Sequence, residues 1–228
     1  GFQVPVDYID GRNDESSLER VEFQIDREQT EKLVSNIHYV YGTDINQILL
    51  SSLAITLFGW TGEKNISLDY ESHGRPNDSL DLSRTVGWFT SIYPIKIDLD
   101  DAKNIDVSLD IGHVIQAVKK CIVLQDDLGQ GYGILKYYGD LKTRNLMAGG
   151  IRKISYNYHG QINSNEENKF KICNEYAGIT HSQTNRRPYL LEFVFYIQEK
   201  TLIGNVLFSD HIHKKATVEK LVDSFRHN

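Results

Sequence analysis

Apolar and polar positions change period several times along the first quarter of the chain. Leu18, Val21, Phe23 and Ile25 roughly alternate with polar neighbours, which predicts a strand over 18–25, because successive side chains of a strand point to opposite faces. Helices are predicted over 26–41 and 44–61. Each stretch opens with an aspartate followed three residues later by a glutamine, as in a capping box, and each is followed by a glycine.

The second of these helices has almost no polar side. Its apolar residues are Ile45, Ile48, Leu49, Leu50, Leu53, Ala54, Ile55, Leu57 and Phe58. A helix that is apolar nearly all round is typical of a buried position. We therefore expect 44–61 to be the central helix of the core.

Short strands and helices follow one another in the rest of the chain. Strands are predicted over 65–70, 88–99, 151–158, 189–198 and 201–208, and helices from Asp106 or Ser108 to 124 and over 134–138, 141–147 and 216–225. Residues 71–81 and 163–187 are predicted loops, Glu199-Lys200 is a predicted hairpin turn, and 1–16 are predicted to be a linker leading into a domain over 17–228. This order predicts an α/β layered sandwich, with one sheet covered by helices.

Composition and charge exclude several classes of function. The 228 residues are 40% hydrophobic and 25% charged, as in an ordinary globular protein, and the net charge of -6 comes without a run of like charges that would indicate nucleic-acid binding. No apolar run approaches the roughly 18 to 20 residues that span a bilayer, and the N-terminus does not resemble a secretory signal. Cys121 and Cys173 are not spaced as a metal or redox motif, so we expect a cytoplasmic protein with a buried, inert Cys121.

Chemistry-bearing side chains gather directly after the strand predicted over 65–70. Glu71-Ser72-His73-Gly74-Arg75-Pro76 places a carboxylate, an imidazole and a guanidinium within five residues. Without further context, such a cluster is typical of a solvated turn with local ion pairs. It resembles the block Glu-Gly-His-Gly-Arg-Glu of the epimerization domains of nonribosomal peptide synthetases, with four of the six positions matching.

A second block supports this resemblance. The run Arg84-Thr85-Val86-Gly87-Trp88-Phe89-Thr90, followed by Tyr93-Pro94, is similar to the epimerization-type form of a block that condensation domains carry in another form. An isolated aromatic strand of this kind usually belongs to a core, but the match is long. Gly87 is expected to permit close backbone approach.

Two further blocks lie downstream. Gly129-Gln130-Gly131-Tyr132-Gly133-Ile134-Leu135 resembles Pro-x-x-Gly-x-Gly-Tyr-Gly-x-Leu, with Asp126 in place of the proline. The glycines could also cradle a phosphate, but no Lys-Ser or Lys-Thr follows them, which disfavours nucleotide binding. Ser155-Tyr156-Asn157-Tyr158-His159-Gly160-Gln161 resembles Phe-Asn-Tyr-Leu-Gly-Gln, and His159 in place of leucine is interpreted as a neutral variation.

The resemblance implies a fold and a set of roles. Epimerization domains have two lobes similar to chloramphenicol acetyltransferase, each with a mixed, mostly antiparallel sheet, and a catalytic channel between the lobes. This chain is similar to the C-terminal lobe. Glu71 would be an acid/base group at the substrate Cα, His73, Trp88, Asn157 and Tyr158 would lie around the channel, and the structural positions would be Arg75, Arg84, Gly87, Gly131, Tyr132 and Gly133.

The resemblance also implies what accompanies this lobe. The substrate would be an aminoacyl or peptidyl thioester on the phosphopantetheine arm of a peptidyl carrier protein, with no cofactor bound directly and no metal. The family's His-His-x-x-x-Asp-Gly motif, whose second histidine is the other acid/base group and whose aspartate would pair with Arg84, is absent, since none of the eight histidines are adjacent. The isolated lobe is therefore expected to be inactive, and to self-associate through the face that would meet the missing N-terminal lobe.

Two other interpretations remain open. The chain is also compatible with a lobe of an amide-forming condensation domain, or with a non-catalytic module that docks carrier proteins.

A metal pair at His211 and His213 has no predictable third ligand, so a solvent-facing pair near the last helix is expected instead.

Overall fold

A computed structural model describes residues 2–75, 81–82, 84–99, 111–123, 129–148, 152–162 and 178–228, with the backbone alone for 36–41 and 123. Several positions named above lie outside the described residues. These are Pro76, Asp106, Ser108, Asp126 and Cys173.

One mixed sheet of six strands organises the molecule, in the order β1-β6-β5-β4-β2-β3. The strands are β1 (Leu18–Ile25), β2 (Asn65–Ser72), β3 (Ser91–Asp98), β4 (Ile154–Ile162), β5 (Leu191–Gln198) and β6 (Thr201–Ser209). The pairs β4·β5 and β2·β4 are parallel and the other three are antiparallel. The mixed, mostly antiparallel sheet predicted from the sequence is confirmed.

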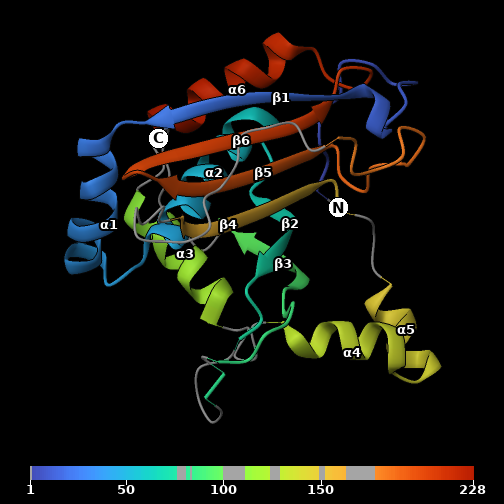
Figure 1. Ribbon diagram of the computed structural model, residues 1–228, viewed down its shortest axis with the longest axis horizontal. Helices are drawn as coiled ribbons and strands as arrows, with labels where there is room; N and C mark the ends of the chain where they lie inside the picture. The colour runs from blue at the N-terminus through green and yellow to red at the C-terminus, as the bar shows by residue number, and fades with distance from the viewer. Residues whose placement is uncertain are drawn as a thin grey trace.

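Helices cover one face of this sheet. The helices are α1 (Arg27–Tyr41), α2 (Ile45–Thr61), α3 (Ile111–Val123), α4 (Gln130–Tyr138), α5 (Leu141–Met147) and α6 (Lys215–His227), and a 3-10 turn, Glu15–Ser17, precedes β1. Figure 1 shows α2 and α6 behind the sheet, while α4 and α5 extend away from it as a separate arm. We call the sheet face turned away from α2 and α6 the open face.

Helix α2 is the centre of the covered side, as predicted. The Asp44 carboxylate accepts a hydrogen bond of 2.8 Å from the Gln47 backbone N–H at its N-terminus, and Gly62 ends it with φ 72°. Leu50, Leu53 and Leu57 are fully buried. The helix contacts α3, α6 and α1, so its apolar surface has partners on several sides.

Strand alternation separates the core from the open face. Along β2 and β5 every second residue is buried and the residues between them are partly exposed. The buried set includes an aromatic cluster in which Tyr70 stacks on Tyr156 at 5.7 Å and Phe195 stacks on Phe225 at 5.2 Å. The partly exposed residues that alternate with the buried ones along the strands form the open face.

Several element boundaries differ from the prediction, among them β4, predicted over 151–158 and found over Ile154–Ile162. Strand β2 continues through Ser72, so Glu71 lies on a strand and not in a loop, whereas β3 begins only at Ser91. Helix α4 begins at Gln130, so Gly131, Tyr132 and Gly133 belong to its first turn. The turn itself is made by Gly129, which has φ 72° and leaves no room for a Cβ because the Tyr93 ring would lie 1.8 Å away.

The segment before β1, expected to be a linker, is part of the folded unit. The Asp7 and Tyr8 backbone N–H groups donate to the Ile212 carbonyl, and Phe2 and Val4 pack against the core. The Asp7 carboxylate accepts a hydrogen bond of 2.8 Å from the Lys214 backbone N–H at the start of α6. The polar composition of this segment reflects backbone pairing and capping across the molecule.

The expectation of a solvent-facing histidine pair is wrong for one of its members. His211 is exposed, but His213 is fully buried, and its Nε2 is 3.0 Å from the Pro5 carbonyl oxygen. A carbonyl only accepts, so Nε2 carries the proton and donates. His213 therefore anchors the N-terminal segment.

Candidate functional site

Glu71 stands near the end of β2 on the open face. The neighbouring Tyr70 and Ser72 are buried on the helix side, whereas Glu71 is partly exposed. The parallel pairing of β2 with β4 sets Glu71 beside Asn157, and the antiparallel pairing with β3 sets it beside Ile92. The predicted acid/base residue and one predicted channel residue thus lie side by side.

The surroundings of Glu71 favour its protonated form. Burial raises the pKa of the Glu71 carboxyl above its usual value, and the negative charge of Glu192 on β5 adds to this effect. The charge of His159 and a hydrogen bond from Asn157 act in the opposite direction on the pKa. A carboxyl with a raised pKa is suited to both accept and return a proton near neutral pH.

Other carboxylates of the open face have close polar partners. Asp69, two residues before Glu71, accepts a hydrogen bond of 2.9 Å from the Tyr189 hydroxyl and lies 3.6 Å from Arg152. Glu192 lies 2.5 Å from Arg187. Among the described residues, no cation lies within ion-pair distance of Glu71, which distinguishes it from these two neighbours.

The segment after β2 is tied to the second sequence block by Arg75. Its guanidinium donates to the carbonyls of Leu82, Thr85 and Gly87 and lies 4.4 Å from the centre of the Phe89 ring. His73 accepts a hydrogen bond from the Arg75 backbone N–H. Arg75 therefore links the first sequence block to the second.

Glycines allow the close contacts in this region. Gly74 has φ 61°, and a Cβ there would lie 1.6 Å from the Phe89 carbonyl oxygen, so no larger residue fits. Gln130, at the start of α4, donates its side-chain amide to the Gly74 carbonyl. A Cβ on Gly87 would lie 2.8 Å from the Phe89 ring, so the close approach is to a side chain and not to backbone. Three sequence blocks thus meet here.

Some predicted channel residues are placed differently. Trp88 is 88% exposed and lies outside β3, in the segment before it, and Arg84 is also exposed. Tyr158 alternates with Asn157 on β4 and packs against the hydrophobic core, away from the face of Glu71. The structure brings Asn157 to Glu71 and does not bring Tyr158 or Trp88 into contact with it.

Sequence reasoning missed four polar residues of the open face. These are Asp69, His159, Tyr189 and Glu192. Burial and the nearby Asp69 charge raise the pKa of the Tyr189 hydroxyl, consistent with its donating a hydrogen bond to that carboxylate. Alternation along β2 puts Asp69 on the face of Glu71, but the strand predicted from the sequence ended at residue 70. The signal for the other three is the strand register, which the sequence alone does not contain.

The arm formed by α4 and α5 has an apolar surface. Tyr132 donates from its hydroxyl to the Met147 carbonyl at 3.4 Å and so links the two helices. The exposed apolar residues of the arm are Ile134, Leu135, Tyr137, Tyr138, Leu141 and Leu146. Exposed apolar surface is common at sites where a protein contacts a partner, a membrane or a ligand.

Metal-binding clusters and membrane-spanning helices are both absent from the described part of the chain. It contains no group of three or more histidine, cysteine, aspartate or glutamate side chains placed to hold a metal ion. None of its helices combines the length and the apolar character that crossing a bilayer requires.

Known proteins resemble this chain along nearly its whole length. It is 33% identical over 227 residues to one of the proteins that make up the linear gramicidin synthase of Brevibacillus parabrevis, covering 97% of this chain and 3% of that protein. It is 31% identical over 226 residues to a component of the plipastatin synthase of Bacillus subtilis (strain 168), covering 98% of this chain and 9% of that protein. The chain is thus similar to a small part of each.

A solved structure has the same architecture. The epimerization domain from the third module of tyrocidine synthetase B superposes with a TM-score of 0.86 at 26% identity, covering 99% of this chain and 50% of that one. The α/β fold class inferred from the sequence is confirmed by this match. A family model described as the Condensation domain matches residues 2–228, and the chain therefore belongs to the Condensation domain family.

Proposed function

We propose that this chain is the C-terminal lobe of an epimerization domain of a nonribosomal peptide synthetase. The observation that carries the proposal is Glu71, a partly buried carboxyl with a raised pKa that lies beside Asn157 on the open face. The similarity to a solved epimerization domain supports it, as do the blocks around Arg75 and Arg84. The reaction would invert an L-amino-acid residue to the D form.

Inversion requires a proton to leave the Cα on one face and another to arrive on the opposite face. A thioester acidifies this carbon, and the remaining barrier is lowered by acid/base groups whose pKa values lie near the working pH. Glu71 would hold or move one of these protons. The second group would belong to the other lobe, because the paired-histidine motif is absent from this sequence.

The substrate would be carried by a partner protein. An aminoacyl or peptidyl thioester on the phosphopantetheine arm of a peptidyl carrier protein meets the chemical requirement, with no metal or redox cofactor. Glu71 provides the acid/base chemistry, and Asn157 donates a hydrogen bond to its carboxylate.

The other lobe would cover apolar surface that is exposed in this chain. This chain spans half of the solved epimerization domain that it resembles. Three exposed apolar residues outside the arm are Val86, Trp88 and Ile92. Ile92 pairs with Glu71 between β2 and β3, and Val86 and Trp88 lie in the sequence block just before β3. We propose that the isolated lobe lacks epimerase activity and self-associates through this surface and the α4–α5 arm.

Amide formation is the second candidate, because the matching family model is that of the Condensation domain. An assay of the complete two-lobe domain distinguishes epimerization from amide formation. The domain is mixed in D2O with a carrier protein that is loaded with an L-aminoacyl thioester. Deuterium at Cα together with D product supports the epimerase. Amide formation with a second loaded carrier, without deuterium uptake, would favour condensation, and neither reaction with retained carrier binding would favour a docking module.

A further inference from the structure

Three carboxylates share the open face. Asp69 and Glu71 alternate along β2, and the strand register aligns Asp69 with Ser155 and Ser155 with Glu192. Glu71 lies one step further along, aligned with Asn157 and then Val194. Glu192 is thus on the same sheet face as Glu71 and two strands away. In the register it aligns with Asp69, two residues before Glu71.

The partner of Glu192 is an unusually buried arginine. The Arg187 side chain is 2% exposed and lies 2.5 Å from the Glu192 carboxylate, which is 26% exposed. Burying a charge costs free energy unless its partner is held in good geometry, and removing one partner leaves an uncompensated charge. Something must therefore hold the backbone of Arg187 in place.

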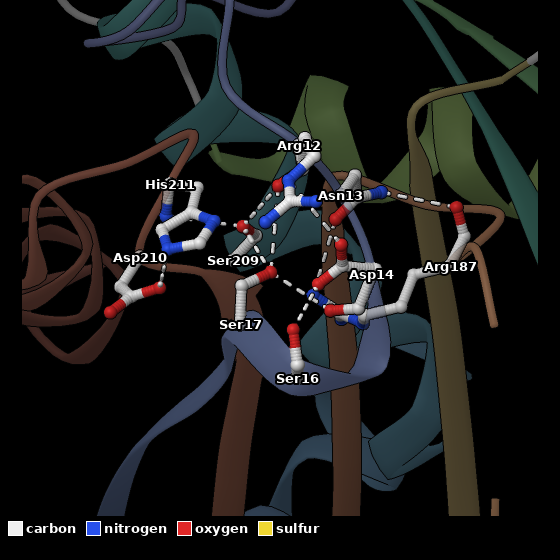
Figure 2. Close-up of polar contacts among 9 residues, drawn as sticks. All are labelled: Arg12, Asn13, Asp14, Ser16, Ser17, Arg187, Ser209, Asp210 and His211. Carbon is white, nitrogen blue, oxygen red and sulfur yellow. Dashed lines mark hydrogen bonds and ion pairs between the residues drawn. The ribbon is translucent and has the colours of Figure 1, made fainter. Parts of the chain in front are cut away.

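The N-terminal segment, residues 2–14, provides this support. The Asn13 side-chain amide donates to the carbonyls of Arg187 (3.1 Å) and Tyr189 (2.8 Å), and the Arg187 backbone N–H donates to the Asn13 carbonyl at 2.9 Å. Figure 2 shows Asn13 beside Arg187 in this arrangement. These bonds fix the backbone on both sides of Pro188, from which the Arg187 and Tyr189 side chains reach Glu192 and Asp69.

The segment is itself fixed to the end of the sheet. The Arg12 carbonyl accepts a hydrogen bond of 2.8 Å from the Ser209 hydroxyl, and Ser209 lies 2.8 Å from the Ser17 hydroxyl (Figure 2). Both serines are buried. Asn13 is therefore anchored to β6 on one side and holds the loop before β5 on the other.

We propose that the ion pair between Arg187 and Glu192 is a positioning device for Glu71, held in place by Asn13. Arg187 would act through Glu192, because it offsets the negative charge that Glu192 presents to Glu71 across the open face. The role in catalysis rests on the proposed function, but the effect on the ionisation of Glu71 does not.

The other groups around Glu71 do not replace this pair. From β4, Asn157 and His159 both favour the ionised carboxylate. From β2 and the loop before β5, Asp69 and Tyr189 bond to each other, and Arg152 lies beside Asp69. Alternation also puts Lys96 of β3 and Tyr196 of β5 on the open face. Glu192 is the charged group that raises the pKa of Glu71 in addition to burial.

Substitutions of the two partners should move the Glu71 titration in opposite directions. Glu192→Gln removes the negative charge and should lower the pKa of Glu71. Arg187→Met leaves that charge uncompensated and should raise it. The double variant should titrate between the two single variants, because it removes both charges of the pair and their opposite effects on Glu71. A structural disturbance alone would not produce opposite signs.

The experiment is an NMR titration of this chain labelled with 13C at the glutamate side-chain carboxyls, with Glu71→Gln identifying the signal. Asn13→Ala is a milder variant that should shift the Glu71 titration in the direction of Arg187→Met, and it carries the test with Glu192→Gln if Arg187→Met does not fold. The control is Glu22→Gln, at β1 on the far edge of the sheet, which should leave Glu71 unchanged.

Two results would overturn the proposal. One is a Glu71 titration that stays the same in folded Glu192→Gln and Asn13→Ala proteins. The other is a shift in the same direction for both. Because no substrate is present, a chain that proves not to belong to an epimerase could still give the predicted shifts, and an active epimerase could fail to give them.

Discussion

The two faces of the sheet use the same strands for different purposes. On the helix side, Tyr70 and Phe195 contribute to a packed aromatic cluster with almost no exposed surface. On the open face, Glu71, next to Tyr70 in the sequence, and Val194, next to Phe195, remain partly exposed. Polar contacts replace packing there. The helix side therefore provides most of the stability of the lobe. Because it does, the open face can carry charged groups whose partial burial costs free energy.

The largest expected difference is between adjacent residues of β5. Phe195→Ala should destabilise the lobe by about 3–5 kcal/mol, because a fully buried ring is lost and leaves a cavity. Val194→Ala, on the open face, should cost under about 1 kcal/mol. Urea unfolding of both variants measures this. Equal losses would mean that the open face is also a core, and would contradict the division.

A second pair of substitutions tests how the α4–α5 arm is joined to the sheet. Gly129→Ala should cost about 1–3 kcal/mol, because φ is 72° and the new Cβ would overlap the Tyr93 ring. Gly133→Ala, inside α4 with nothing within 4 Å of the new Cβ, should instead stabilise by about 0.5–1 kcal/mol. Thermal unfolding midpoints compare the two. A neutral Gly129→Ala would mean that the arm does not depend on this turn.

The buried histidine on the helix side predicts a loss of stability in mild acid. Burial lowers the pKa of His213 below the usual value of 6.5. Above that pH neither folded nor unfolded chain binds a proton there. As the pH falls below it, the unfolded chain is protonated first, so stability decreases until the lowered pKa of the folded state is passed.

Urea midpoints between pH 7.5 and 5 measure this dependence. His213→Gln should flatten part of the decrease, whereas His211→Gln, at an exposed position, should not. A wild-type slope that both variants leave unchanged would assign the acid sensitivity to other groups.

The smallest predicted effect is on the open face. The folded-state pKa of Glu71 is raised, so its contribution to stability is full below the usual value of 4.5 and is lost as the pH rises through the folded-state value. Glu71→Gln should therefore stabilise the lobe at pH 7, by about 0.5 kcal/mol or less. The gain should disappear below pH 4.5. Destabilisation at pH 7 would show that the carboxylate has a structural role.

Periodicity predicted the helix-covered side well. The all-round apolar pattern of 44–61 identified the central helix, and alternation identified the strand that became β1. These features are local in the sequence. Burial of one helix or strand face is visible in the spacing of its own residues.

The open face was less predictable, because its contacts depend on strand register and on distant backbone bonds. Glu71 and Asn157 were found through the resemblance to a family. Glu192 lies on the same sheet face as they do because of the register in which β4 and β5 pair. The role of Asn13 depends on hydrogen bonds to residues more than 170 positions away. The placement of Tyr158 on the core side also follows from the register, which local spacing does not determine.

Glu71 is proposed to move a proton at the substrate Cα. The most direct test compares Glu71→Gln with Glu219→Gln, a control on the exposed side of α6, in the complete two-lobe domain supplied with a carrier-bound L-aminoacyl thioester in D2O. The proposed role of Glu71 predicts that Glu71→Gln lowers Cα–deuterium exchange and inversion by about 10²- to 10⁴-fold, with the control unchanged. Exchange at the wild-type rate in a folded Glu71→Gln domain would contradict it.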